Sequence, residues 1–99
     1  MYREITTLRE LREITTTGKA ILIFHAEWCG PCKAYRPIYE RVGRNTNVSI
    51  IRSDIDKSPE LVEHFGIRTV PTTVIITDGG VEAKNGIVQY STLIEGLNK

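Results

Sequence analysis

Apolar and polar positions along the chain follow two spacings, one typical of strands and one typical of helices. The clearest apolar run covers residues 20–24, whose five consecutive apolar side chains predict a central strand covered on both faces. Further segments with strand-type patterns predict strands at residues 2–5, 48–52, 72–77 and 81–85. The turn signal Asp78-Gly79-Gly80 joins the last two strands, which we therefore expect to pair antiparallel.

Two helices are predicted in the first half of the chain. The first begins with a capping box from Thr7 to Glu10, continues with leucine and isoleucine at helical spacing, and ends at Gly18. The second covers residues 32–42, where apolar side chains again recur at helical spacing. Pro37 lies inside this segment and removes one backbone hydrogen bond, so we expect a kinked helix.

Two shorter helices are predicted in the second half. Ser58 and Pro59 are an N-cap residue and a first helical residue, and the helix that they begin is expected to end at Phe65, before Gly66. Ser91 is expected to cap a last helix that runs to the C-terminus. Because strands and helices alternate without linkers or repeats, the pattern predicts an α/β layer structure.

Composition narrows the class of protein. A length of 99 residues favours one domain over residues 1–99, and 40% hydrophobic with 25% charged residues is typical of globular proteins. The net charge of +1, without any block of like charges, argues against nucleic-acid binding. Apolar runs fall far short of the ~20 residues of a membrane span, and the N-terminus lacks a signal-peptide core, so we expect a cytoplasmic protein without membrane contact.

The two cysteines are the most informative feature of the sequence. Cys29 and Cys32 are separated by Gly30 and Pro31, and a disulfide across so short a loop stabilises a fold only slightly. The pair follows a predicted buried strand and begins a helix, where backbone N–H groups and the helix dipole favour a thiolate. The sequence therefore predicts a redox-active pair, with thiol–disulfide exchange as its chemistry.

Two other interpretations of the cysteines were weighed. The thiols of Cys29 and Cys32 would be inert if they were buried core residues, but the flanking tryptophan, glycine and proline argue against this. A zinc site would need about four ligands, which His25 and His64 would complete. His64 falls on a different predicted helix, so no bound metal is expected.

Residues 24–33, with the sequence FHAEWCGPCK, resemble the active site of the thioredoxin family. The resemblance extends from about residue 20 to the C-terminus and includes further segments: Pro37, Asp54-Ile55-Asp56, Val70-Pro71-Thr72 and Gly86. It implies a thioredoxin-like three-layer α/β fold, with a central mixed sheet of about five strands flanked by about four helices.

The family resemblance also implies roles for individual residues. Cys29 would be the exposed nucleophile that attacks a protein disulfide, and Cys32 the buried thiol that resolves the mixed disulfide. Pro71 would follow a cis peptide bond. The residues expected to form the substrate groove are Trp28, Gly30, Pro31, Ile55, Val70, Pro71 and Gly86. No cofactor besides the Cys29–Cys32 disulfide is expected, and an NADPH-dependent thioredoxin reductase would return electrons to a monomeric protein.

The sequence departs from the family at three positions near the cysteines. Ile23 replaces the buried aspartate that serves as proton acceptor for the resolving thiol, and Arg52 replaces a lysine near it. His25 replaces a tryptophan and is either a substitute base or a ring packed at the end of the strand. His25, Lys33 and Arg52 are therefore candidates for tuning the thiol pKa values.

Two other functions are compatible with the same predicted fold. A binding module of thioredoxin-like fold would not need its thiols, so retention of both cysteines and of the groove favours a redox enzyme. A glutathione-dependent glutaredoxin-type enzyme usually carries Pro-Tyr between its cysteines, and this chain has Gly30-Pro31.

Overall fold

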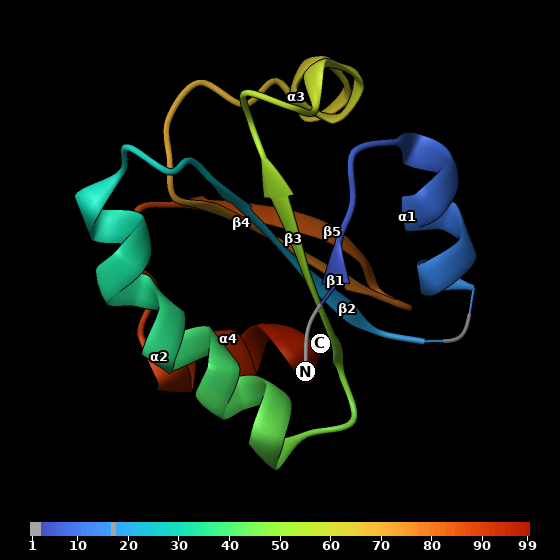
Figure 1. Ribbon diagram of the computed structural model, residues 1–99. Coiled ribbons are helices and arrows are strands. Elements are labelled where there is room, and N and C mark those ends of the chain that lie inside the picture. Colours follow the sequence, from blue (N-terminus) through green and yellow to red (C-terminus); the bar gives the residue numbers. More distant parts are fainter. Residues whose placement is uncertain (1–2, 17) are drawn as a thin grey trace.

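The computed structural model describes residues 3–16 and 18–99, and within them five strands form one mixed sheet. The strands are β1 (Arg3–Glu4), β2 (Ala20–His25), β3 (Ser49–Asp54), β4 (Thr72–Thr77) and β5 (Gly80–Asn85). Their order across the sheet is β1-β3-β2-β4-β5, with β1, β3 and β2 parallel and the β4–β5 hairpin antiparallel (Figure 1). The predicted strands and hairpin are confirmed, although residue 2 of the first expected strand lies outside the described residues.

Helices cover both faces of this sheet and form the expected three layers. Within the described ranges they are α1 (Leu8–Thr15), α2 (Gly30–Asn45), α3 (Pro59–Phe65) and α4 (Tyr90–Leu97). Helices α2 and α4 pack on one face, and α1 and α3 lie on the other (Figure 1). In the part of the chain that is described, no helix combines the length and the apolar character needed to cross a membrane.

Alternation of side chains along β2 divides the core into two halves. Ile21 and Ile23 point toward α2 and α4, and Leu22 and Phe24 point toward α1 and α3. The β2 strand is buried along its whole length, as expected for a central strand of a sheet covered on both faces. Residues at the end of β2 that point toward α2 therefore lie beneath the cysteine-bearing end of that helix.

The capping box of α1 is confirmed. Thr7 Oγ1 accepts a hydrogen bond from the Glu10 backbone N–H at 3.2 Å, and the Glu10 carboxylate accepts one from the Thr7 N–H at the same distance. The Thr6 N–H and the Thr7 side chain hold the pKa of Glu10 below its ordinary value. The helix ends at Thr15, earlier than predicted, and Gly18 follows with a φ of 144°.

Ser58 is the N-cap residue of α3 and Pro59 its first helical residue, as predicted, but the Ser58 side chain makes no cap hydrogen bond, and Ser91 is not at the cap position expected for it. Ser58 precedes α3, but its hydroxyl is buried and accepts a hydrogen bond from Ser53 Oγ at 2.6 Å instead of capping the helix. Helix α4 begins at Tyr90, which places Ser91 inside its first turn. Contacts with α2 hold Tyr90 there, since the Arg41 guanidinium lies 4.0 Å from the centre of its ring.

Helix α2 begins at Gly30, earlier than predicted, and continues through Pro37 to Asn45. Tyr35 and Tyr39 project from it into the core and are almost completely buried. The Tyr35 hydroxyl lies 2.7 Å from Thr73 Oγ1 on β4, and burial raises the pKa of Tyr35 to about 12. Tyr35 is therefore neutral near pH 7, and its hydroxyl links helix α2 to the sheet.

Replacing Tyr35 by phenylalanine is expected to lower the free energy of unfolding by about 1–2 kcal/mol, because the Thr73 hydroxyl loses its buried partner. The double variant Tyr35→Phe/Thr73→Val removes both polar groups and is expected to recover part of that loss. Urea denaturation of the two single variants and the double variant measures this coupling. Additive losses would show that the hydrogen bond contributes nothing.

Candidate active site

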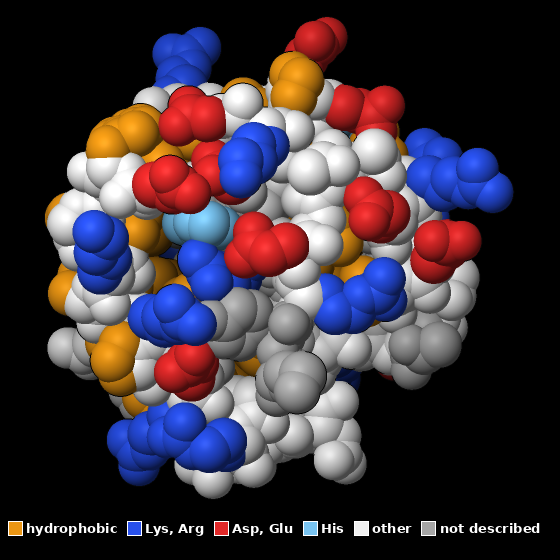
Figure 2. All heavy atoms as spheres, in the orientation of Figure 1, with side chains coloured by type: hydrophobic (Ala, Val, Ile, Leu, Met, Phe, Trp, Pro, Cys, Tyr) orange, Lys and Arg blue, Asp and Glu red, His pale blue; other side chains and the backbone are white. Residues whose placement is uncertain are grey.

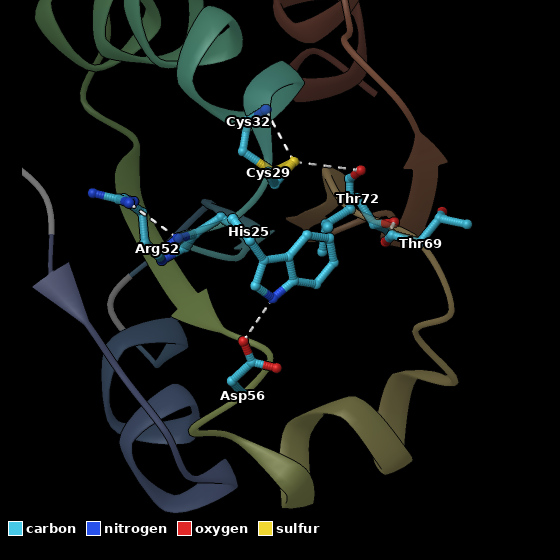
Figure 3. Close-up of a disulfide and its surroundings, with 9 residues drawn as sticks. His25, Cys29, Cys32, Arg52, Asp56, Thr69 and Thr72 are labelled. Atoms are coloured by element: carbon cyan, nitrogen blue, oxygen red, sulfur yellow. Dashed lines mark hydrogen bonds between the residues drawn. A yellow bond between two sulfur atoms is a disulfide. The ribbon is translucent and has the colours of Figure 1, made fainter.

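A disulfide joins Cys29 and Cys32 where the loop after β2 enters α2 (Figure 3). Cys29 is the N-cap residue of α2, and its Sγ accepts a hydrogen bond from the Cys32 backbone N–H at 3.1 Å. The Val70 carbonyl oxygen lies 3.7 Å from the same sulfur. A thiolate formed at Cys29 would be stabilised by this N–H and by the positive end of the helix dipole.

The expected difference in exposure between the cysteines is not present in this oxidised state. Cys29 is 4% exposed and Cys32 is 7% exposed, so the sulfur expected to meet the substrate is no more accessible than its partner. Both cysteines pack with Ala26, and the half-buried Ile55 and Val70 lie against them. These apolar neighbours cover Cys29.

The predicted groove residues lie around the disulfide on several elements. The Val70–Pro71 peptide bond is cis, and the Pro71 carbonyl accepts a hydrogen bond from the Gly86 N–H at 2.8 Å, where Gly86 adopts a φ of 80°. This contact brings the segment after β5 beside the cis-proline loop. Gly30 and Pro31 are exposed at the first turn of α2.

Trp28 is the exposed wall of this site. It is 68% exposed, yet its indole Nε1 donates a hydrogen bond to Asp56 Oδ2 at 2.9 Å. Asp56 follows β3, and its backbone N–H is held by Asp54 Oδ1 at 2.9 Å. The large apolar surface of Trp28 is thus fixed in orientation while it stays open to a partner.

Replacing Asp56 by alanine is expected to release the Trp28 ring and to lower its steady-state fluorescence anisotropy, while stability changes by less than about 1 kcal/mol because the bond is exposed. Trp28 is the only tryptophan in the sequence, so its emission reports this site alone. Asp78→Ala, in the β4–β5 turn, is the matched control. Equal anisotropy in both variants would contradict a fixed ring.

A charged cluster lies on the other side of the disulfide, at the end of β2. His25 is 8% exposed, and its Nε2 lies 3.1 Å from Glu4 Oε1. Its Nδ1 lies 3.1 Å from Arg52 Nη2, and Arg52 Nε lies 3.2 Å from Glu4 Oε2. We call these three residues the Glu4–His25–Arg52 cluster; Figure 3 shows His25 directed toward Arg52.

Glu4 is the member of this cluster that the sequence did not indicate. It lies on the short edge strand β1 and pairs in register with Arg52 on β3, which in turn pairs with Ile23 on β2. The carboxylate therefore lies two strands away from Ile23, in the same row across the sheet. Only the pairing of β1 with β3 brings Glu4 here, and no local pattern in the sequence shows that pairing.

Lys33 and His64 complete the predicted candidates. Lys33 is exposed in the first turn of α2 and lines the same cavity as Cys32. His64 is exposed on α3, where its ring contacts Phe65. Among residues 3–16 and 18–99, no group of three or more His, Cys, Asp or Glu side chains is placed to hold a metal ion.

Comparison with known proteins decides the family. The sequence model of the Thioredoxin family matches residues 6–99. The chain belongs to the thioredoxin family. It is 33% identical over 98 residues to the thioredoxin of Chlamydia muridarum, with 97% of this chain and 96% of the relative covered. It is 30% identical over 103 residues to that of Rickettsia felis, with coverage of 100% and 98%.

Solved structures agree with the sequence comparison. Oxidised mitochondrial thioredoxin 3 of Saccharomyces cerevisiae superposes with a TM-score of 0.86 at 28% identity, covering 98% of this chain and 93% of that one. Thioredoxin-family members are protein disulfide oxidoreductases, and the cysteine pair that performs this exchange is present here. The chain is therefore a thiol–disulfide oxidoreductase of the thioredoxin family.

Proposed function

We propose that this protein reduces protein disulfides, with Cys29 as the nucleophile and Cys32 as the resolving thiol. The observation that carries the assignment is the Cys32 N–H directed at Cys29 Sγ from the start of α2. A negative charge on Cys29 is stabilised there, and the thiolate is the form that attacks a disulfide.

The reaction proceeds in two exchanges. The Cys29 thiolate attacks one sulfur of the substrate disulfide, forming a Cys29–substrate disulfide and releasing one substrate thiolate. The Cys32 thiol then loses its proton and attacks Cys29 Sγ, so that the Cys29–Cys32 bond forms and the second substrate sulfur leaves as a thiolate. Two electrons pass from the dithiol to the substrate.

The groove supports an extended protein segment as substrate. Trp28 and Val70 border the disulfide as apolar surfaces, and Gly30, Pro31, Ile55, Pro71 and Gly86 complete the proposed contact surface. Pro71 has no N–H, so the neighbouring Val70 backbone is the group that can pair with an extended chain.

The cellular setting is part of the same proposal. Residues 1–99 act as one domain and as a monomer in the cytoplasm. An NADPH-dependent thioredoxin reductase regenerates the dithiol, because each turnover consumes two electrons that this chain does not supply. Addition of NADPH and a thioredoxin reductase to the oxidised protein tests this partner directly through NADPH consumption.

Turnover of insulin disulfides with dithiothreitol as reductant, followed from about pH 6 to about pH 9, tests the proposed activity. We expect a rate well above the dithiothreitol background that requires Cys29. A rate equal to background would contradict a reductase and would favour a binding module.

A further inference from the structure

The hydrogen-bonding roles of the two His25 ring nitrogens follow from their partners. Arg52 has only donor groups, so His25 Nδ1, 3.1 Å from Arg52 Nη2, accepts that hydrogen bond. Nε2 then carries the proton and donates it to Glu4 Oε1 at 3.1 Å. In this arrangement Nδ1 is the accepting nitrogen, covered by an Arg52 donor, and Nε2 faces the Glu4 carboxylate.

A cavity connects this imidazole to the resolving thiol. It has a volume of about 550 Å³, is open on one side, and is lined by Cys32 of α2 as well as by all three cluster residues. Cys29 does not line it. Solvent that enters the cavity therefore reaches Cys32 at a place that Cys29 does not line, so a proton can leave there while the substrate is bound to Cys29.

Other charged and titratable groups also face the cavity. From α2 these are Lys33, Arg36 and Tyr39; from β3 and the loops they are Asp54, Glu27 and Lys57. Figure 2 shows acidic and basic side chains interspersed on this face around a histidine ring. Asp54 uses Oδ1 to hold the Asp56 N–H, and the Glu27 side chain is exposed. His25, Asp54 and Tyr39 are the buried groups among these, and His25 is the one whose ring lies between the Arg52 guanidinium and the Glu4 carboxylate.

The geometry points to His25 as the acceptor of the Cys32 proton during resolution of the mixed disulfide, with Glu4 and Arg52 as positioning residues. This assignment rests on the proposed roles of the two cysteines. The Cys32 S–H bond breaks and its proton passes through cavity water to His25 Nδ1. The resulting thiolate forms the bond to Cys29 Sγ, and the substrate sulfur leaves with the electron pair of the broken disulfide.

Glu4 and Arg52 each have a defined part in this step. Glu4 faces Nε2–H and stabilises the imidazolium that forms, as a carboxylate beside a catalytic histidine does. In this step Arg52 Nη2 gives up its hydrogen bond to His25 Nδ1. Arg52 Nε meanwhile keeps its contact with Glu4 Oε2, at 3.2 Å. The imidazolium later returns its proton to solvent through the open side of the cavity.

Single-turnover kinetics separate this step from the first attack. Reduced protein is mixed with a disulfide-bonded fluorescent peptide, and formation and decay of the mixed disulfide are followed by rapid acid quench and mass spectrometry. We expect His25→Gln to slow decay at least about tenfold while formation stays within about twofold. We expect Glu4→Gln to slow decay less and to move the midpoint of its pH profile to lower pH, because the imidazolium loses its carboxylate partner.

His64→Gln, at the other histidine of the chain, is the matched control and is expected to match wild type in both steps. Added imidazole is expected to restore decay in His25→Ala, which a packing role for His25 would not produce. Unchanged decay in His25→Gln, or slow decay in His25→Ala that imidazole does not restore, would overturn the assignment of His25. Failure to form any mixed disulfide at Cys29 would instead contradict the proposed function.

Discussion

Replacing Cys29 by serine is expected to lower disulfide reduction by about 10³-fold or more, to the background rate of the reductant. A serine hydroxyl is not ionised near neutral pH, so neither the Cys32 N–H nor the helix dipole has a thiolate to stabilise. The measurement is the initial rate of insulin reduction by dithiothreitol at a fixed pH. Residual activity above about one tenth of wild type would contradict the role of Cys29.

Cys32→Ser is the matched control for this loss. It also prevents formation of the Cys29–Cys32 disulfide, so both variants should be compared with reduced wild type. Thermal unfolding followed by circular dichroism should show the three reduced proteins equally folded. We expect Cys32→Ser to keep the first attack on substrate, which Cys29→Ser loses.

Replacing Ile23 by aspartate is expected to lower the free energy of unfolding by about 3 kcal/mol or more at pH 7. Ile23 is 1% exposed and packs in the core beneath α2, so the variant loses apolar contacts and buries a carboxyl group. Arg52, its neighbour in register, is already engaged with Glu4 and His25. Urea denaturation at pH 7 measures the loss.

The pH dependence of this loss separates charge burial from lost packing. Burial raises the pKa of a carboxyl group in the folded state above its unfolded value, so the penalty is fully present above the folded pKa and disappears as pH falls below the unfolded value. Ile23→Asn is the control, with a similar shape and no titration. If the stability deficit of Ile23→Asp relative to Ile23→Asn did not shrink at low pH, the carboxyl group would not be buried.

Local patterns in the sequence were sufficient to predict most of the fold. The apolar run at residues 20–24 became the central strand β2, and Asp78-Gly79-Gly80 became the β4–β5 turn. The Thr7–Glu10 capping box was also confirmed. The turn and the capping box depend on contacts between residues a few positions apart, and the central strand depends on burial of both its faces. Each of these produces a pattern that can be recognised in the sequence.

Features that depend on distant contacts were missed or misplaced. Serine is a common N-cap residue, so Ser91 was predicted to cap the last helix. Packing of Tyr90 against α2 instead makes Tyr90 the first residue of α4. The burial of Cys29 comes from Ile55 and Val70, which are distant in sequence. Glu4 joins His25 only because β1 pairs with β3, and a two-residue edge strand carries no signal of its partner.

The part of the site that depends on residues close together in the sequence was predicted. The spacing of Cys29 and Cys32 at a helix start indicated thiol–disulfide exchange, and the structure places the Cys32 N–H on Cys29 Sγ. Ile23 stands where the family resemblance implies an aspartate, so the sequence predicted that the usual proton acceptor is missing. The sequence named His25 as one candidate to replace it, and the cavity that joins Cys32 to the Glu4–His25–Arg52 cluster supplies the geometry that favours this role.

Mass spectrometric mapping of trapped mixed disulfides tests the central claim most directly. Reduced Cys32→Ser and reduced Cys29→Ser are each incubated with the same disulfide-bonded peptide, quenched with acid and digested. We predict that the peptide accumulates on Cys29 of the Cys32→Ser protein, because no second thiol resolves it, and that Cys32 of the Cys29→Ser protein remains free. Accumulation on Cys32, or equal labelling of both cysteines, would contradict the assignment of Cys29 as the nucleophile.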